Sequence, residues 1–99
     1  MEKRRPTYDL DAIKTTFGSI ETLAITTSAL RDAIGLGFDR ASIVEVISGM
    51  TRKMFVKSMT TFADHRVWQD VYRPVTRSGE VYLKLTVIED VLVVSFKEL

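Results

Sequence analysis

The chain has 99 residues and a mass of 11.2 kDa, enough for one domain with a single small core, and its 45% apolar and 27% charged residues are typical of a globular protein. It contains no cysteine, which excludes disulfides, thiolate metal sites and cysteine nucleophiles. No apolar stretch follows the basic start as in a signal peptide, and no apolar run reaches the roughly 18 residues of a membrane span. We therefore expect a soluble cytoplasmic protein that does not engage a membrane.

Positive charge is concentrated in the second half of the chain. The net charge is only +1, from 14 basic and 13 acidic residues, but residues 52–84 contain seven basic and three acidic residues. Their cations are interleaved with aromatic residues, a mixture suited to phosphates and bases. A half-exposed sheet with a cationic outward face would show the same pattern. The residues are Arg52, Lys53, Lys57, Arg66, Arg73, Arg77 and Lys84, with Phe55, Phe62, Trp68, Tyr72 and Tyr82 among them.

Capping residues and apolar spacing predict three helices in the first half of the chain. Asp9, Thr27 or Ser28, and Asp39 are the predicted N-caps, and Gly18, Gly35 and Gly49 the predicted ends. Residues 19–24, between the first two helices, are interpreted as a short strand. The predicted buried stripes are Leu10, Ile13 and Phe17, then Leu30, Ala33 and Ile34, then Ile43, Val44 and Ile47.

The second half of the chain has the composition and alternation of strands. Strands are expected at residues 54–61, 67–73, 81–88 and 91–97, and Pro74 would stop the second. Helices followed by strands predict an α+β fold, with the helices packed on one face of a mostly antiparallel sheet. Residues 1–99 would form this single domain.

The last two strands predict a register. With Glu89 and Asp90 as a two-residue loop, Ile88 faces Val91 and the pairing runs back from there. A slip of one residue would exchange the two faces of the hairpin, so this register is favoured. The predicted core pairs are Leu83–Phe96, Leu85–Val94 and Val87–Leu92, and the predicted polar pairs are Tyr82–Lys97, Lys84–Ser95 and Thr86–Val93.

Motifs for metal or nucleotide binding are missing. The single histidine, His65, lies in an expected polar turn, and Asp64, Asp70 and Glu80 form no recognised magnesium motif. The five glycines are interpreted as helix ends and turns, not as a phosphate-binding loop. We therefore expect neither a metal nor a cofactor.

The polar face of the hairpin permits one kind of chemistry. RNA supplies its own nucleophile, the 2′-hydroxyl beside the scissile phosphate, so that an enzyme needs only a base, an acid and cations. A tyrosine beside lysines, helped by an amide, can provide all three without a metal. Nearby cations lower the pKa of a phenol, and crowding with desolvation lowers that of a lysine.

Several segments of the sequence resemble the MqsR family of toxins. They are MEKR at residues 1–4, FVKSMTT at 55–61, DH at 64–65, WQDVYRP at 68–74, VYLK at 81–84, TVI at 86–88, DVL at 90–92 and VSFKE at 94–98. The resemblance is close over residues 54–98 and loose over residues 7–50. Phe62 and Glu89 depart from the family pattern, which has a tyrosine and a histidine at these positions.

The resemblance implies a RelE-like ribonuclease that cuts messenger RNA at GC-containing triplets without the ribosome. It implies a cognate, zinc-binding helix-turn-helix antitoxin like MqsA that represses the shared operon, so that operator DNA is reached only through the complex. The family's active-site residues fall on Lys57, Gln69, Tyr82 and Lys97.

We hypothesise a metal-independent endoribonuclease in which Tyr82 and Lys57 transfer protons, Gln69 orients the phosphate or ribose, and Lys97 supplies charge. Which of Tyr82 and Lys57 is the base stays open, and Arg73 and Lys84 are candidates for contacts to the RNA backbone. The alternatives are a non-catalytic RNA-binding or translation-regulating module, and a structural subunit whose sheet edge captures another chain.

Overall fold

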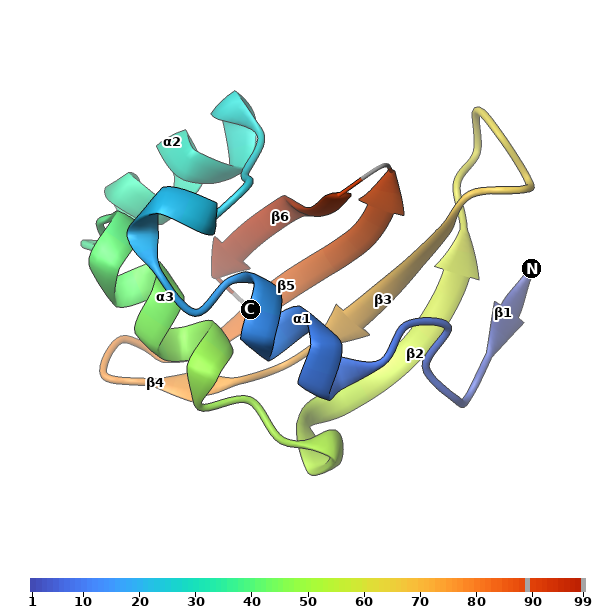
Figure 1. The fold of residues 1–99 in the computed structure, drawn as a ribbon, viewed down its shortest axis with the longest axis horizontal. Helices are drawn as coiled ribbons and strands as arrows, with labels where there is room; N and C mark the ends of the chain where they lie inside the picture. The colour runs from blue at the N-terminus through green and yellow to red at the C-terminus, as the bar shows by residue number, and fades with distance from the viewer. Residues whose placement is uncertain (89, 99) are drawn as a thin grey trace.

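The computed structural model describes residues 1–88 and 90–98, which form three α-helices on a six-stranded sheet (Figure 1). Within those residues, no helix is long and apolar enough to cross a membrane. The helices are α1 (Leu10–Thr16), α2 (Thr27–Gly35) and α3 (Arg40–Ser48), with 3-10 turns η1 (Ile20–Thr22) and η2 (Arg52–Met54). The strands are β1 (Glu2–Lys3), β2 (Phe55–Thr60), β3 (Trp68–Tyr72), β4 (Val75–Thr76), β5 (Gly79–Ile88) and β6 (Asp90–Glu98).

Side-chain caps start the helices largely where they were predicted. The Asp9 carboxylate accepts a hydrogen bond from the Asp11 N–H at 2.9 Å, and Asp39 forms a capping box with Ser42. Thr26 caps α2, one residue before the predicted Thr27 or Ser28, because its hydroxyl accepts from the Ala29 N–H.

The short strand predicted at residues 19–24 is wrong. This segment forms the 3-10 turn η1 instead. The Thr22 hydroxyl donates to the Ser19 carbonyl at 3.1 Å and lies 3.1 Å from the Ser19 hydroxyl. Such local bonds favour a turn over an extended chain.

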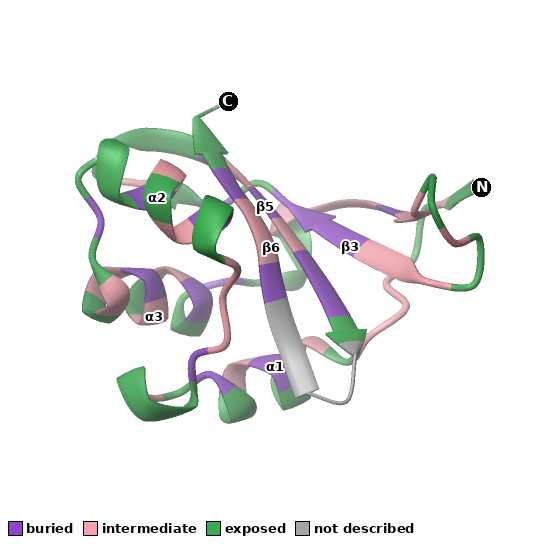
Figure 2. Ribbon diagram, turned by 90° about the horizontal axis from the view of Figure 1, so that it is seen from above, coloured by how far each residue is buried: buried purple, intermediate pink, exposed green. Residues whose placement is uncertain are grey.

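The strands pair antiparallel in the order β1-β2-β3-β5, with β4 and β6 also paired to β5. All three helices lie on one side of this sheet, and the other side carries none (Figures 1 and 2). The predicted α+β class is thus confirmed. We call the helix-free side the open face.

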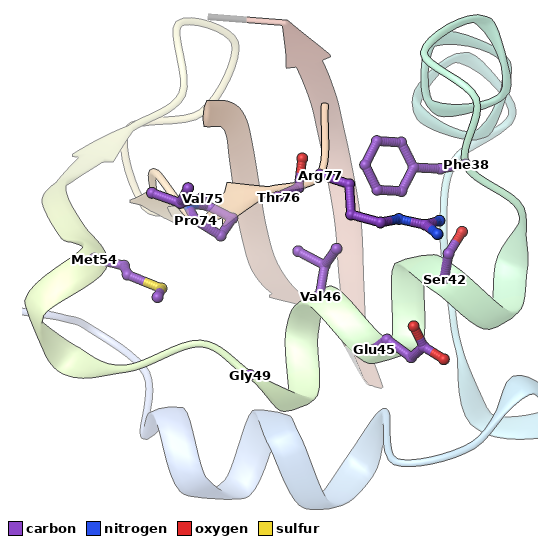
Figure 3. Close-up of a pocket in the computed structure, with 10 residues that line it drawn as sticks. All are labelled: Phe38, Ser42, Glu45, Val46, Gly49, Met54, Pro74, Val75, Thr76 and Arg77. Carbon is purple, nitrogen blue, oxygen red and sulfur yellow. The ribbon is translucent and has the colours of Figure 1, made fainter. Parts of the chain in front are cut away.

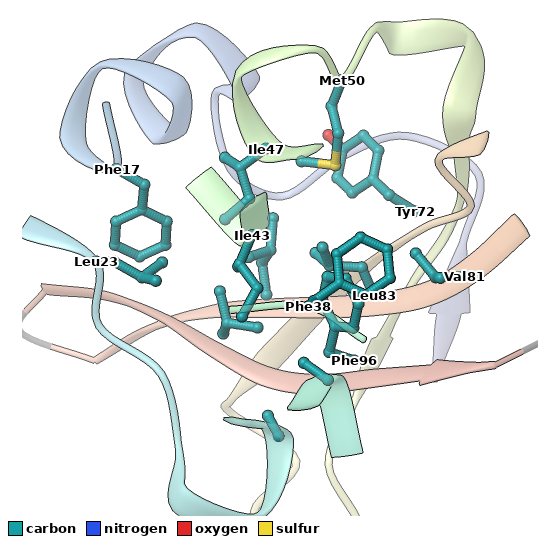
Figure 4. Packing of buried hydrophobic residues seen from close by; sticks show 14 of the residues in the cluster. Phe17, Leu23, Phe38, Ile43, Ile47, Met50, Tyr72, Val81, Leu83 and Phe96 are labelled. Atoms are coloured by element: carbon teal, nitrogen blue, oxygen red, sulfur yellow. The ribbon is translucent and has the colours of Figure 1, made fainter. Parts of the chain in front are cut away.

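The hydrophobic core lies between the helices and the sheet (Figure 4). Phe17, Ile43 and Ile47 from the helical half meet strand residues such as Leu83, and each of these four side chains is fully buried. The prediction for Ile34 is wrong, because 59% of it is exposed on α2. The buried apolar residues of the cluster are Ile13, Phe17, Leu23, Ala29, Ala33, Phe38, Ile43, Ile47, Met50, Tyr72, Val81, Leu83, Leu85, Val93 and Phe96.

The predicted hairpin register is correct only over its outer half. Tyr82 pairs with Lys97, Leu83 with Phe96 and Lys84 with Ser95, as expected. A bulge between Lys84 and Leu85 then shifts the pairing, with Val94 as the extra residue of β6. The predicted pairs Leu85–Val94, Thr86–Val93, Val87–Leu92 and Ile88–Val91 are therefore wrong, and the observed ones are Leu85–Val93, Thr86–Leu92, Val87–Val91 and Ile88–Asp90.

A long-range pairing accounts for this shift. The Thr26 N–H donates to the Val93 carbonyl at 3.0 Å, and the Val93 N–H donates to the Ala24 carbonyl at 2.9 Å. Val93 is thereby buried in the core, whereas Val94 is only half-buried. Asp90 belongs to β6 and not to a loop, and Glu89 lies outside the described residues.

Candidate active site on the open face

Strand register sets one row of side chains across four strands of the open face. Lys57 of β2 pairs with Val71 of β3, Val71 pairs with Lys84 of β5, and Lys84 pairs with Ser95 of β6. Paired residues on neighbouring strands point to the same side, with their Cβ atoms about 5 Å apart. Val71 is fully buried yet lies outside the core cluster, between Lys57 and Lys84 in this row.

Tyr82 and Lys97 lie directly opposite each other beside this row. Tyr82 is two residues before Lys84 on β5, so both side chains point to the open face. The Lys84 Nζ atom lies 5.5 Å from the centroid of the Tyr82 ring. Tyr82 and Lys84 are half-buried, and Lys97 is exposed.

Gln69 occupies the same face from β3. It lies two residues before Val71 and pairs with Met59 of β2, and its side chain is half-buried. The fold thus gathers Lys57, Gln69, Tyr82 and Lys97, the four predicted catalytic residues, on one face.

Lys84 is at the centre of this group, and its environment disfavours a charge on it. Partial burial lowers the pKa of the Lys84 ammonium below its usual value, and the positive charges of Lys97 and Lys57 lower it further.

Lys57 has the opposite environment because it is paired with Glu2. The Lys57 Nζ atom donates a hydrogen bond to the Glu2 carboxylate at 2.7 Å. This bond raises the pKa of Lys57, and partial desolvation opposes it. The same bond lowers the pKa of Glu2. Glu2 could not be placed at the site from the sequence, since no local pattern predicts that residues 2–3 form a strand.

A buried carboxylate holds the N-terminal segment that brings Glu2 to the site. The Asp70 carboxylate is fully buried and accepts hydrogen bonds from the N–H groups of Thr7 and Tyr8 at 3.0 and 2.9 Å. The Lys3 ammonium also lies 4.4 Å from the centroid of the Trp68 ring. With residues 7 and 8 fixed on β3, β1 runs along the edge of β2 and pairs Lys3 with Ser58.

Two further predicted groups lie outside the centre of the face. Arg73 donates to the Glu80 carboxylate at 2.8 Å, in an ion pair whose side chains are 47% and 45% exposed. His65 is exposed in the β2–β3 connection, next to the Arg66–Asp64 ion pair. Of the two residues expected to contact RNA, Arg73 is thus already paired, whereas Lys84 is central.

A separate pocket of about 330 Å³ lies on the helical side (Figure 3). It is formed by α3 residues such as Val46 and by the segment from Pro74 to Arg77. Neither Tyr82 nor the lysines of the open face line it, so this pocket and the open face are distinct features.

The helix-covered sheet with a cationic, tyrosine-bearing open face defines a small α+β protein suited to a polyanionic ligand. Residues 5–98 match the family described as "Motility quorum-sensing regulator, toxin of MqsA". The chain is also 51% identical over 100 residues to the mRNA interferase toxin MqsR of Escherichia coli (strain K12), with 99% of each chain covered. The chain therefore belongs to the MqsR toxin family.

Proposed function

We propose that this chain is the toxin of a toxin–antitoxin pair and acts as an endoribonuclease on messenger RNA. Support comes from the family, described as a toxin of MqsA, and from the E. coli relative, an mRNA interferase by name. The observation that carries the proposal is the pairing of Tyr82 with Lys97 beside Lys84 on the open face. An acid–base group and cations thereby lie where an extended RNA strand can reach them.

The proposed reaction uses the 2′-hydroxyl of the RNA as the nucleophile. Its oxygen gives up its proton to a general base as it attacks the adjacent phosphorus, the bond from phosphorus to the 5′-oxygen breaks, and the Tyr82 hydroxyl donates a proton to that leaving oxygen. Lys57 and Lys97 offset the negative charge that develops on the phosphate oxygens, and the Gln69 amide orients the phosphate or ribose. The products are a 2′,3′-cyclic phosphate and a 5′-hydroxyl.

The ion pair with Glu2 favours a charged Lys57 in this scheme. The hydrogen bond to Glu2 raises the pKa of Lys57, which supports an electrostatic role for this lysine and a proton-transfer role for Tyr82.

Lysine, tyrosine and glutamine complete this reaction without a divalent cation, which supports metal independence. Cleavage at GC-containing triplets and independence of the ribosome follow from the family resemblance. Arg73 and Lys84 would contact the RNA backbone. The substrate places the toxin in the cytoplasm.

The proposed partner is a zinc-binding helix-turn-helix antitoxin like MqsA, through which alone the toxin would reach operator DNA. Expression of the chain by itself should arrest growth, and co-expression of the partner should relieve the arrest. Intact growth and intact messenger RNA after overproduction of folded protein would contradict the toxin role.

The direct test is cleavage of a short synthetic RNA by the purified protein. We expect the RNA to be cut and a strand with deoxyribose at the scissile position to stay whole, because the deoxy strand lacks the nucleophile. RNA binding without cleavage would favour the alternative, a non-catalytic RNA-binding module. In that case a salt titration of binding would still report the phosphate contacts.

A further inference from the structure

On the open face, Lys84 lies between three of the proposed catalytic residues, Lys57, Tyr82 and Lys97. Lys57 lies on the same row beyond Val71, about 10 Å away at the backbone, because two strand spacings separate them. Lys97 lies diagonally across from Lys84 on β6, and the Tyr82 ring lies beside its ammonium on β5. A phosphate seated among the three lysines would therefore have Lys84 nearest its middle.

Two other cations near this face are paired with carboxylates, whereas Lys97 is exposed. Lys57 is paired with Glu2, and Arg73 is paired with Glu80. In the part of the chain that the structure describes, no ion pair includes Lys84, whose side chain is half-buried next to the buried Val71. A half-buried amine between two cations and without a carboxylate is the kind of lysine that gives up its proton.

We propose that Lys84 is a further catalytic residue, the base that accepts the proton of the attacking 2′-hydroxyl. This assignment rests on the proposed endoribonuclease activity and replaces a simple backbone contact for Lys84. The lowered pKa of Lys84 agrees with it, since a larger share of the amine is then neutral near pH 7.

Lys84 and Tyr82 together account for every proton that moves in the reaction. Neutral Lys84 takes the proton of the 2′-hydroxyl as the 2′-oxygen bonds to phosphorus, and Tyr82 gives its proton to the departing 5′-oxygen. This leaves a Lys84 ammonium beside a Tyr82 phenolate. Transfer of one proton from the ammonium to the phenolate restores both groups for the next cycle.

The test compares Lys84→Arg with Lys53→Arg, a control at an exposed lysine of η2. Arginine keeps the positive charge but cannot act as a base near neutral pH. Cleavage is measured at saturating protein, and binding is measured on the same RNA with a 2′-O-methyl group at the scissile position. We expect Lys84→Arg to bind within about threefold of the parent and to cleave on the order of 100-fold more slowly. Lys53→Arg should match the parent in both.

The pH dependence gives a second readout. The groups around Lys84 are Lys57 with Glu2, Gln69, Tyr82 and Lys97. Cleavage by the parent should rise with pH as Lys84 loses its proton, and Lys84→Arg should lack this rise. Should Lys84→Arg melt abnormally, Lys84→Ala supplies the same test, because added methylamine should restore part of its cleavage.

Cleavage by Lys84→Arg within threefold of the parent would overturn the assignment. Equal losses of binding and cleavage would also overturn it, because Lys84 would then be a phosphate-binding cation only. A parent protein that binds the RNA and never cuts it would instead refute the endoribonuclease itself, and the base role with it.

Discussion

The ammonium of Lys57 lies 2.7 Å from the carboxylate of Glu2, although 55 positions separate the two residues in the chain. This contact raises the pKa of Lys57, whereas partial burial and the charges of Lys97 and Lys57 lower the pKa of Lys84. The two lysines of the central row thus have opposite electrostatic environments.

Replacing Glu2 by Gln should lower the pKa of Lys57. The amide still accepts a hydrogen bond but carries no charge, so the stabilisation of the ammonium falls. The measurement is an NMR titration of the lysine side chains, with the exposed Lys53 as the internal reference. An unchanged Lys57 titration would mean that the ion pair does not persist in solution.

Tyr82 and Leu83 are neighbours whose substitutions should have opposite effects. Tyr82→Phe removes one hydroxyl from the open face and should change stability by about 0.5 kcal/mol or less, yet slow cleavage on the order of 100-fold. Leu83→Ala should cost about 2–5 kcal/mol, because Leu83 is fully buried in the core. Thermal melting and RNA cleavage on the same preparations check both. Parental cleavage by Tyr82→Phe would remove Tyr82 from the mechanism.

Tyr72 provides a matched control for Tyr82. Its ring is fully buried on the helical side of β3, and within the described residues its hydroxyl has no hydrogen-bond partner. Tyr72→Phe should therefore leave cleavage unchanged and raise the melting temperature, since an unpaired buried hydroxyl is removed. A lower melting temperature would show that the hydroxyl has a partner in solution.

Tyr72 should also make stability fall in alkali. Burial raises the pKa of Tyr72 to about 12, so between pH 10 and 12 the unfolded chain gives up this proton while the folded chain keeps it. The folded state then binds more protons than the unfolded state, and the free energy of unfolding decreases as pH rises. Urea unfolding at pH 9 and pH 11 should show a smaller decrease for Tyr72→Phe than for the parent.

Asp70 should matter both for stability and for the ion pair of Lys57 with Glu2. Asp70→Ala leaves the partly buried N–H groups of Thr7 and Tyr8 without their acceptor, at a cost of about 1–3 kcal/mol. Release of this segment would also free β1 and separate Glu2 from Lys57. Urea unfolding measures the first effect and the Lys57 titration the second. Asp64→Ala is the control, since its carboxylate pairs with Arg66 in the β2–β3 connection, and it should change far less.

Cleavage should persist when divalent cations are removed. The proposed acid, base and charge-carrying groups are all side chains of this protein, so EDTA should leave both the rate and the cyclic phosphate product unchanged. Mass analysis of the cleaved ends identifies the product. Activity lost in EDTA and restored by magnesium or manganese would contradict the mechanism.

Helix caps and the outer half of the last hairpin could be predicted because they depend on residues close in sequence. Asp9 and Asp39 bond to N–H groups within three positions, and strict alternation around Leu83 sets Tyr82 opposite Lys97. The segments that resemble the MqsR family indicated the candidate site residues, including Gln69, which lies on β3 and not on the last hairpin.

Only the tertiary structure decided the bulge at Val94, the ion pair of Lys57 with Glu2 and the central position of Lys84. The bulge accompanies a pairing of β6 with residues 24–26, and the Lys57–Val71–Lys84 row needs three strands in register. These contacts join segments far apart in the chain, and many partners are compatible with each local pattern. The sequence determined the side chains available for RNA chemistry, whereas long-range packing decided which of them lie together and which lysine pairs with Glu2.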